Sequence, residues 1–208
     1  MMTDMTMDNF LAVLSSSEPV PGGGGACGYV AAVGMSLGNM VLALTTGKKK
    51  YAEYQEEIEE LIVKATDLTK KLAECMDKDA ESFKPLAAAY GLPKDTEEQI
   101  KEREAIMAKA LVTASEAPLS MMELILEAMK LIDRISVIGS RIAISDAGVG
   151  AAFCKAALQG ASLNVYINTK SMADREYAEE LNRKADAMLE KYTKIADDTF
   201  NSVLGRLK

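Results

Sequence analysis

The sequence contains no histidine among its 208 residues. This absence excludes zinc sites with imidazole ligands and nucleophiles activated in Ser-His or Cys-His pairs. Any proton transfer therefore has to use Asp, Glu, Lys, Tyr, Cys, a backbone group or water. If the chain is an enzyme, we expect carboxylates and lysines to carry its chemistry.

Cysteine is also scarce. Cys27, Cys75 and Cys154 lie far apart and match neither a disulfide framework nor a metal-binding spacing, so we expect no metal site. Residues 1–10 contain two aspartates and no basic residue, which is unlike a secretory signal. An odd number of scattered thiols is typical of a reducing compartment, and we expect a cytoplasmic protein.

Basic residues are outnumbered, because 24 Lys and Arg face 31 Asp and Glu and give a net charge of -7. General nucleic-acid binding needs a basic surface, so the charge argues against that class of partner. The length fits one domain spanning residues 1–208, with enough chain to bury a substantial core.

No charged residue lies between Glu18 and Lys48. The stretch begins with a proline-containing turn and a glycine run, continues as a small-residue apolar segment, and ends in a lysine run. The glycines are Gly22, Gly23, Gly24 and Gly25, and the lysines are Lys48, Lys49 and Lys50. A glycine-rich turn that enters a helix leaves backbone N–H groups free to hold an anion or a polar ring.

A transmembrane span is the alternative interpretation of residues 26–44, which have roughly the ~20-residue length that a bilayer core requires. Glycine, serine and asparagine interrupt this segment, and the mean hydropathy of the whole chain is close to zero. A buried core helix is the better interpretation, and we expect no membrane partner.

Every long segment has the periodicity of a helix, and none alternates as a strand does. Thr96 and Gln99 form a predicted capping box, and Pro118 either kinks the helix that follows or starts another. The expected helices are residues 7–15, about 25–46, 51–90, 96–117 with its continuation from 118, 146–167 and 174–207.

Two of these helices, residues 25–46 and 146–167, are almost free of charge. A helix that is apolar on all sides has to be surrounded, and small residues let neighbouring backbones approach closely. The sequence therefore predicts an all-α bundle of long helices with these two at its centre. One domain of this size can hardly enclose both, so we expect a homodimer.

Asp79 is the clearest candidate for chemistry. The apolar stripe through Ile58, Ala65 and Leu72 continues by seven residues to Asp79, which places this carboxylate in the packed seam. A buried carboxylate is costly unless it is paired, and its pKa rises. The alternative is a buried hydrogen-bonding group without a chemical role, or a carboxylate that is partly exposed where the helix diverges.

Other polar residues cluster at the helix ends. Ser145 and Asp146 are predicted as an N-cap pair. Asn164 and Asn168 share one helix face and either line a polar pocket or cap the helix end. The three lysines either terminate the first charge-free helix, where they complement its dipole, or form an anion site.

Taken together and in order, these motifs resemble the cyclodeaminase/cyclohydrolase family of folate enzymes. The segments that carry the resemblance are residues 19–25, 47–51 (GKKKY), 79–83, 90–96 (YGLPKDT), 145–149 (SDAGV) and 157–168 (ALQGASLNVYIN). The chain is similar to the free-standing form of the family. One departure is that residues 139–142 stand where the family usually has a Gly-Asn loop, so the choice between related reactions stays open.

The resemblance implies an all-α homodimer that acts on formimino- or methenyl-tetrahydrofolate without a metal or redox cofactor. Both reactions pass through a tetrahedral carbon and need a group that accepts and then donates a proton. We hypothesise that Asp146 is this acid/base and that Asp79 assists it or orients water.

The remaining predicted site residues bind the substrate. The glycine run, Asn164 and Asn168 hold the pterin, Ser145 lies beside Asp146, and the lysines receive the glutamate carboxylates of a substrate that can be polyglutamylated. The alternative function is a non-catalytic helical dimer that binds folate or another anionic ring compound.

Overall fold

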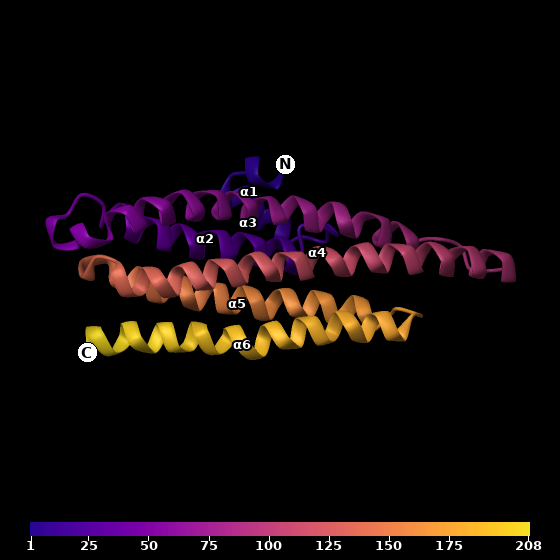
Figure 1. The fold of residues 1–208 in the computed structure, drawn as a ribbon. Coiled ribbons are helices and arrows are strands. Elements are labelled where there is room, and N and C mark those ends of the chain that lie inside the picture. Colours follow the sequence, from indigo (N-terminus) through magenta and orange to yellow (C-terminus); the bar gives the residue numbers. More distant parts are fainter.

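The computed structural model describes all 208 residues and contains helices and no strands. Its α-helices are α1 Met7–Leu14, α2 Gly23–Ala43, α3 Gln55–Tyr90, α4 Glu97–Ile138, α5 Ile144–Thr169 and α6 Arg175–Leu207, and its 3-10 turns are Met2–Asp4, Lys49–Tyr54 and Arg141–Ala143. Figure 1 shows the five long helices side by side in an elongated bundle, with α1 on the outside. The predicted all-α class is confirmed.

The helix boundaries follow local signals in the sequence. The Thr96 side chain accepts a hydrogen bond from the Gln99 backbone N–H, and the Gln99 side chain accepts one from the Thr96 backbone, so the predicted capping box is confirmed. Pro118 lies inside α4, which continues through it as a single helix. At the start of α6, Asp174 caps the backbone N–H of Tyr177 at 3.0 Å.

The prediction that Ser145 and Asp146 cap a helix is wrong. A 3-10 turn leads directly into α5, so the helix already begins at Ile144 and its N-cap is Ala143, which makes no side-chain cap bond. Asp146 therefore lies inside the first turn, where a negative charge is still favourable beside the helix dipole.

The lysine run does not complement the dipole of α2. That helix ends at Ala43, and its last turn contains no basic residue. Lys48 follows it in the connecting segment, and Lys49 begins the next 3-10 turn. The alternative role as an anion site remains open for these lysines.

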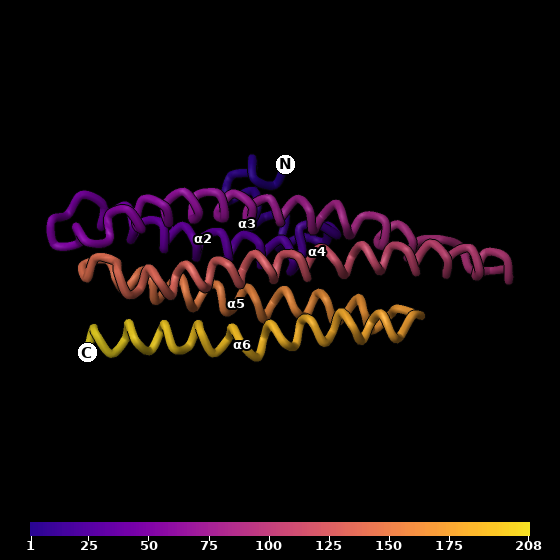
Figure 2. The backbone as a smooth tube through the Cα atoms, in the orientation of Figure 1, coloured from indigo at the N-terminus to yellow at the C-terminus, as the bar shows by residue number.

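Helix α2 packs against α3, α4 and α5, and α5 packs against α2, α4 and α6. Helices α2 and α5 run antiparallel, as Figure 2 traces, because Gly34 lies opposite Gly150 and Gly23 lies opposite Asn164. A Cβ atom on Gly150 would lie 2.7 Å from the Gly34 carbonyl oxygen. The two backbones therefore touch, as the small-residue pattern predicts.

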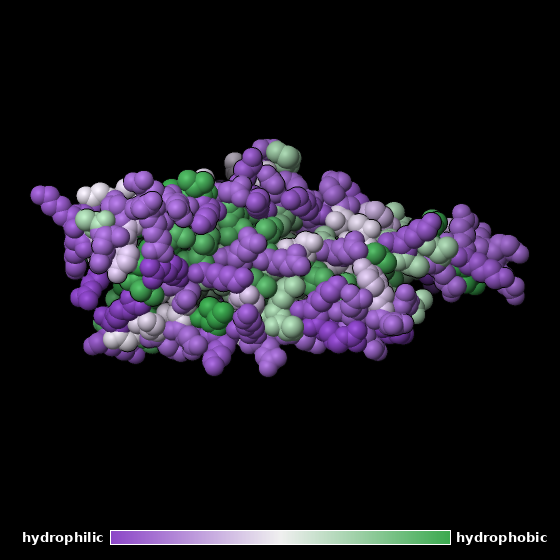
Figure 3. Space-filling view, in the orientation of Figure 1, coloured by the Kyte–Doolittle hydropathy of each residue, from purple (hydrophilic) through white to green (hydrophobic).

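Neither α2 nor α5 is covered on all sides by the chain itself. Large apolar side chains remain exposed on both and on the turn before α5, namely Met40, Leu44, Ile142, Val149, Phe153, Leu163 and Ile167. On the face drawn in Figure 3, hydrophilic side chains cover most of the surface, and hydrophobic ones gather in patches along the middle of the bundle.

Helix α2 is long and apolar enough to cross a membrane by length and composition alone. Core helices of soluble proteins pass the same test. Because α2 contacts three other helices of the bundle, its packing agrees with the predicted core helix.

We expect Gly150→Ala to lower the free energy of unfolding by roughly 1–3 kcal/mol, because the added methyl group overpacks the contact with Gly34. Gly205→Ala in α6 is the matched control, since nothing lies within 4 Å of its new Cβ. The control should leave stability unchanged or raise it by at most about 1 kcal/mol. Urea unfolding followed by circular dichroism measures both variants, and equal stability would contradict the close α2–α5 contact.

Candidate functional site

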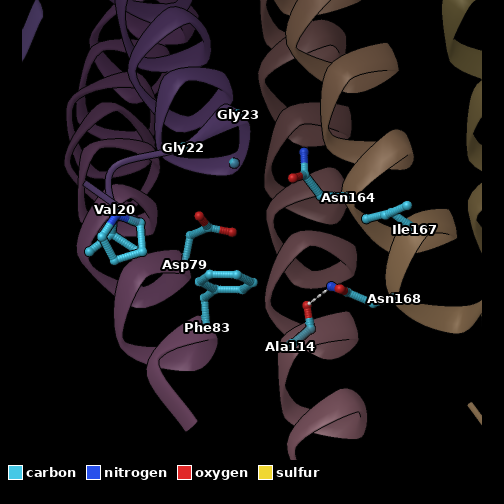
Figure 4. Close-up of a pocket in the computed structure, with 11 residues that line it drawn as sticks. Val20, Gly22, Gly23, Asp79, Phe83, Ala114, Asn164, Ile167 and Asn168 are labelled. Carbon is cyan, nitrogen blue, oxygen red and sulfur yellow. Dashed lines mark hydrogen bonds between the residues drawn. The ribbon is translucent and has the colours of Figure 1, made fainter. Parts of the chain in front are cut away.

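A pocket of about 190 Å³ opens where the N-terminus of α2 faces α3, α4 and α5. Figure 4 shows side chains from these elements pointing toward a common space. Its lining residues are Pro19, Val20, Gly22, Gly23, Gly24, Asp79, Phe83, Ala114, Asn164, Ile167 and Asn168. The sequence-predicted residues Asp79, Asn164, Asn168 and three of the four glycines are thus brought together.

The Asp79 carboxylate lies directly against the backbone of α2. A Cβ atom on Gly24 would overlap it, so only glycine leaves room for the carboxylate there. No Lys or Arg forms a salt bridge with Asp79. Burial therefore raises the pKa of Asp79, and the backbone N–H of Gly25 offsets this shift only in part.

Cys27 lies one helical turn beyond Gly24 and near the same carboxylate. Burial raises the pKa of its thiol to about 11, and the negative charge of Asp79 adds to the shift. The thiolate is the nucleophilic form of cysteine. Cys27 is therefore a neutral neighbour of Asp79 and not an activated nucleophile.

Two asparagine amides form the α5 wall of the pocket. The Asn164 Nδ2 donates to the Gly160 carbonyl at 2.9 Å, and the Asn168 Nδ2 donates to the Ala114 carbonyl at 2.8 Å. One N–H of each amide is committed to a backbone carbonyl, so the Oδ1 acceptor and the second N–H of each amide remain available to a ligand.

Phe83 and Ile167 add apolar surface to the pocket, and Ile167 is 63% exposed. Neither was a predicted site residue. Phe83 follows Asp79 by four residues and so lies on the same face of α3. This helical spacing could have identified Phe83 from the sequence. The sequence could not predict that the Ala114 carbonyl lies at the pocket, because only the packing of α4 against α5 brings it there.

Gly25 is the predicted glycine that does not line the pocket. It is buried behind the turn, where a Cβ atom would lie 3.2 Å from the Pro21 side chain. Its contribution to the site is the backbone N–H near Asp79.

Asp146, Ser145 and the three lysines lie at the opposite end of the α2–α5 pair. Asp146 precedes Asn164 by 18 positions (164 − 146) on the same helix, which corresponds to roughly 27 Å at the helical rise of about 1.5 Å per residue. One chain therefore does not bring these residues to the pocket that contains Asp79.

This opposite end is basic and internally hydrogen-bonded. Lys48 Nζ donates to Ser140 Oγ at 3.1 Å, and the Ser140 N–H donates to Thr45 Oγ1 at 2.8 Å. The Arg141 N–H donates to the Tyr51 hydroxyl at 3.1 Å, and this bond is the main reason that the pKa of Tyr51 is lowered.

No group of three or more Cys, Asp or Glu side chains is arranged to hold a metal ion. The chemistry that the pocket itself can supply is proton transfer by Asp79, hydrogen bonding by backbone N–H groups and amide oxygens, and apolar contact with Phe83 and Ile167.

Comparisons with known proteins agree on one family. A family model described as Formiminotransferase-cyclodeaminase matches residues 6–187. The chain is 36% identical over 202 residues to the methenyltetrahydrofolate cyclohydrolase of Methylorubrum extorquens, covering 97% of each protein. It is 27% identical over 187 residues to the mouse formimidoyltransferase-cyclodeaminase, covering 90% of this chain but 35% of that protein.

A solved structure shows that the fold is shared. The crystal structure of formiminotetrahydrofolate cyclodeaminase from Thermotoga maritima matches with a TM-score of 0.82 and 23% sequence identity. The match covers 98% of this chain and 100% of that one.

The raised pKa of Asp79 predicts how stability depends on pH. Below the ordinary aspartate pKa, the Asp79 carboxyl is protonated in both the folded and the unfolded protein and does not lower the free energy of unfolding. As the pH rises through the folded-state pKa, the carboxyl becomes charged in the folded protein, and the free energy of unfolding falls. Asp79→Asn should therefore be more stable than the parent at pH 7, and the difference should vanish near about pH 3.

Denaturant unfolding at the two pH values measures this difference. Asp198→Asn is the control, because Asp198 is exposed on α6 and has no ion pair. An Asp79→Asn variant that is less stable than the parent at pH 7 would show that the carboxylate stabilises the fold, against this account.

Proposed function

The chain belongs to the formiminotransferase-cyclodeaminase family, and from that premise we propose that it is a folate enzyme that opens or forms 5,10-methenyltetrahydrofolate. The near full-length similarity to a methenyltetrahydrofolate cyclohydrolase favours hydrolysis of the methenyl carbon. Cyclodeamination of formimino-tetrahydrofolate is the second candidate, supported by the fold shared with the Thermotoga maritima cyclodeaminase.

The observation that carries the proposal is an unpaired, half-buried carboxylate in a pocket large enough to admit a ring. In the hydrolysis, water attacks the carbon that bridges N5 and N10, and the Asp79 carboxylate accepts the proton that the water loses. The resulting carboxylic acid then donates this proton to the departing nitrogen as the C–N bond breaks, and the hydroxyl group left on the carbon releases its proton to solvent as the formyl C=O forms. A pKa above the usual aspartate value suits a group that has to hold the proton between these steps.

The same group can serve cyclodeamination. There N10 attacks the formimino carbon and loses a proton, and ammonia departs after it has been protonated. Asp79 would accept the first proton and supply the second. Gly22, Gly23 and Gly24 offer backbone contacts to the ring, and Phe83 provides a flat apolar wall.

We also propose that the enzyme is a homodimer built on the exposed apolar face of α2 and α5. The face contains Leu163 and Phe153, which are 67% and 38% exposed, and almost no charge. A second copy that covers this face would bury it. A two-fold axis in the interface and perpendicular to the helices would place the basic end of one chain against the pocket of the other.

In this arrangement, the pocket of one subunit and the basic end of the other form one composite site, although the two lie far apart within a single chain. Lys48, Lys49 and Lys50 of one subunit would receive the glutamate carboxylates of a substrate held by the other subunit, including those of a polyglutamylated substrate. Asp146 and Ser145 of one subunit would likewise contact the substrate held by the other subunit. Asp146 can act as the predicted acid/base only in such a dimer. We propose a cytoplasmic location, in keeping with three free thiols.

We expect Asp79→Asn to lower turnover by at least the ~100-fold that general acid/base catalysis typically contributes, because asparagine cannot carry the proton. The absorbance of methenyl-tetrahydrofolate measures consumption or production in assays with methenyl and formimino substrates. Asp146→Asn, assayed in parallel, should show a comparable loss only if the partner subunit supplies that carboxylate. Asp198→Asn on the surface of α6 should match the parent.

Near-parental turnover in folded Asp79→Asn would contradict the assignment of the proton carrier. A spectral shift proportional to protein, without turnover in the parent protein, would instead identify a non-catalytic folate binder.

The composite site predicts complementation between two damaged subunits. Asp79→Asn and Lys48→Ala should each lower activity with polyglutamylated substrate. A mixed dimer of these two variants contains one site with both parental residues and one site that lacks both. Because equal amounts of the two variants form about half mixed dimers on refolding, the mixture should regain about a quarter of the parental activity. Activity no higher than the sum of the separately refolded variants would place both residues' functions within a single chain.

A further inference from the structure

Pro118 lies in the interior of α4 and is buried. A proline inside a helix has no N–H group to donate to the carbonyl oxygen four residues earlier. That carbonyl belongs to Ala114, which lines the pocket. The sequence of α4 therefore removes the usual helical donor from one specific carbonyl at the site.

The amide of Asn168 supplies a donor to this carbonyl. Its Nδ2 lies 2.8 Å from the Ala114 oxygen, and the dashed line in Figure 4 marks this bond between α5 and α4. A carbonyl oxygen can only accept a hydrogen bond, so the bond also decides which end of the amide faces it. Asn168 is 9% exposed and is held in one orientation.

The orientation leaves the Asn168 Oδ1 available to a ligand. This atom accepts no hydrogen bond within the chain, and it is not among the buried atoms that lack a partner. It therefore keeps access to solvent at the pocket. Asn164 differs, because its Nδ2 donates to Gly160 within the same helix and its orientation does not depend on α4.

We propose that Pro118 is a positioning residue for ligand recognition, which fixes the Asn168 amide through the Ala114 carbonyl so that Oδ1 accepts an N–H group of the bound ring. The ligand class rests on the proposed function: the ring is the pterin of tetrahydrofolate, which carries N–H donors. Asp79 supplies the proton transfer on the other side of the pocket, so Asn168 acts in binding and not in the chemical step.

Pro118→Ala tests this role, because alanine returns the N–H group that competes for the Ala114 carbonyl. We expect the Kd for tetrahydrofolate, measured by calorimetric titration, and the KM for the methenyl substrate to rise by about tenfold, the effect of losing one hydrogen bond to the ligand. The kcat should change much less. Pro85→Ala is the matched control, since Pro85 is an exposed proline inside α3 that does not line the pocket.

A double-mutant cycle distinguishes positioning from a general effect on the helix. In an Asn168→Ala background, Pro118→Ala should change Kd by less than about twofold, because the side chain through which it acts is gone. In an Asn164→Ala background, it should keep its full effect. Equal effects of Pro118→Ala in the parent and Asn168→Ala backgrounds would overturn the proposal.

The Asn168 side-chain amide can also be observed directly in ligand-free protein by nitrogen-15 NMR. Its hydrogen-bonded proton should exchange slowly in the parent and in Pro85→Ala, and faster in Pro118→Ala. Unchanged exchange in Pro118→Ala would overturn the positioning role. If the parent protein fails to bind tetrahydrofolate, the proposed function and the assigned ligand both fall, and the exchange measurement alone decides whether Pro118 positions Asn168.

Discussion

The site depends on how closely the backbone of α2 approaches its neighbours. Glycine at position 24 lets the Asp79 carboxylate lie against that backbone, and the contact between Gly34 and Gly150 holds α5 beside α2. These approaches partly bury Asp79 without giving it a cation, and this burial raises its pKa. The small residues that allow the bundle to pack are thus also the residues that raise the pKa of this carboxyl group.

Much of this architecture can be predicted from the sequence because helical periodicity is regular. The apolar stripe of α3 places Asp79 on the buried face, and the four-residue spacing of Asn164 and Asn168 places both amides on one side of α5. The capping box at Thr96 is equally local, since both of its partners lie within one turn. Each of these predictions needs only the geometry of a single helix.

Features that depend on contacts between helices could not be predicted in this way. The sequence shows a proline within a helical segment, but only the packing of α5 reveals that Asn168 donates to the Ala114 carbonyl. The distance between Asp146 and the pocket could not be predicted either, because the order of motifs along the chain does not show how far apart they lie in the fold. The N-cap prediction for Ser145 failed because a preceding 3-10 turn starts the helix earlier.

The central claim is that Asp79 holds and returns a proton in a folate-binding pocket. The most direct test is a carbon-13 NMR titration of the Asp79 carboxyl, with and without saturating tetrahydrofolate. The account predicts a titration midpoint above the ordinary aspartate value in the free protein and a change of the Asp79 signal when the ligand binds. A midpoint at or below the ordinary value, with no response to bound ligand, would contradict it.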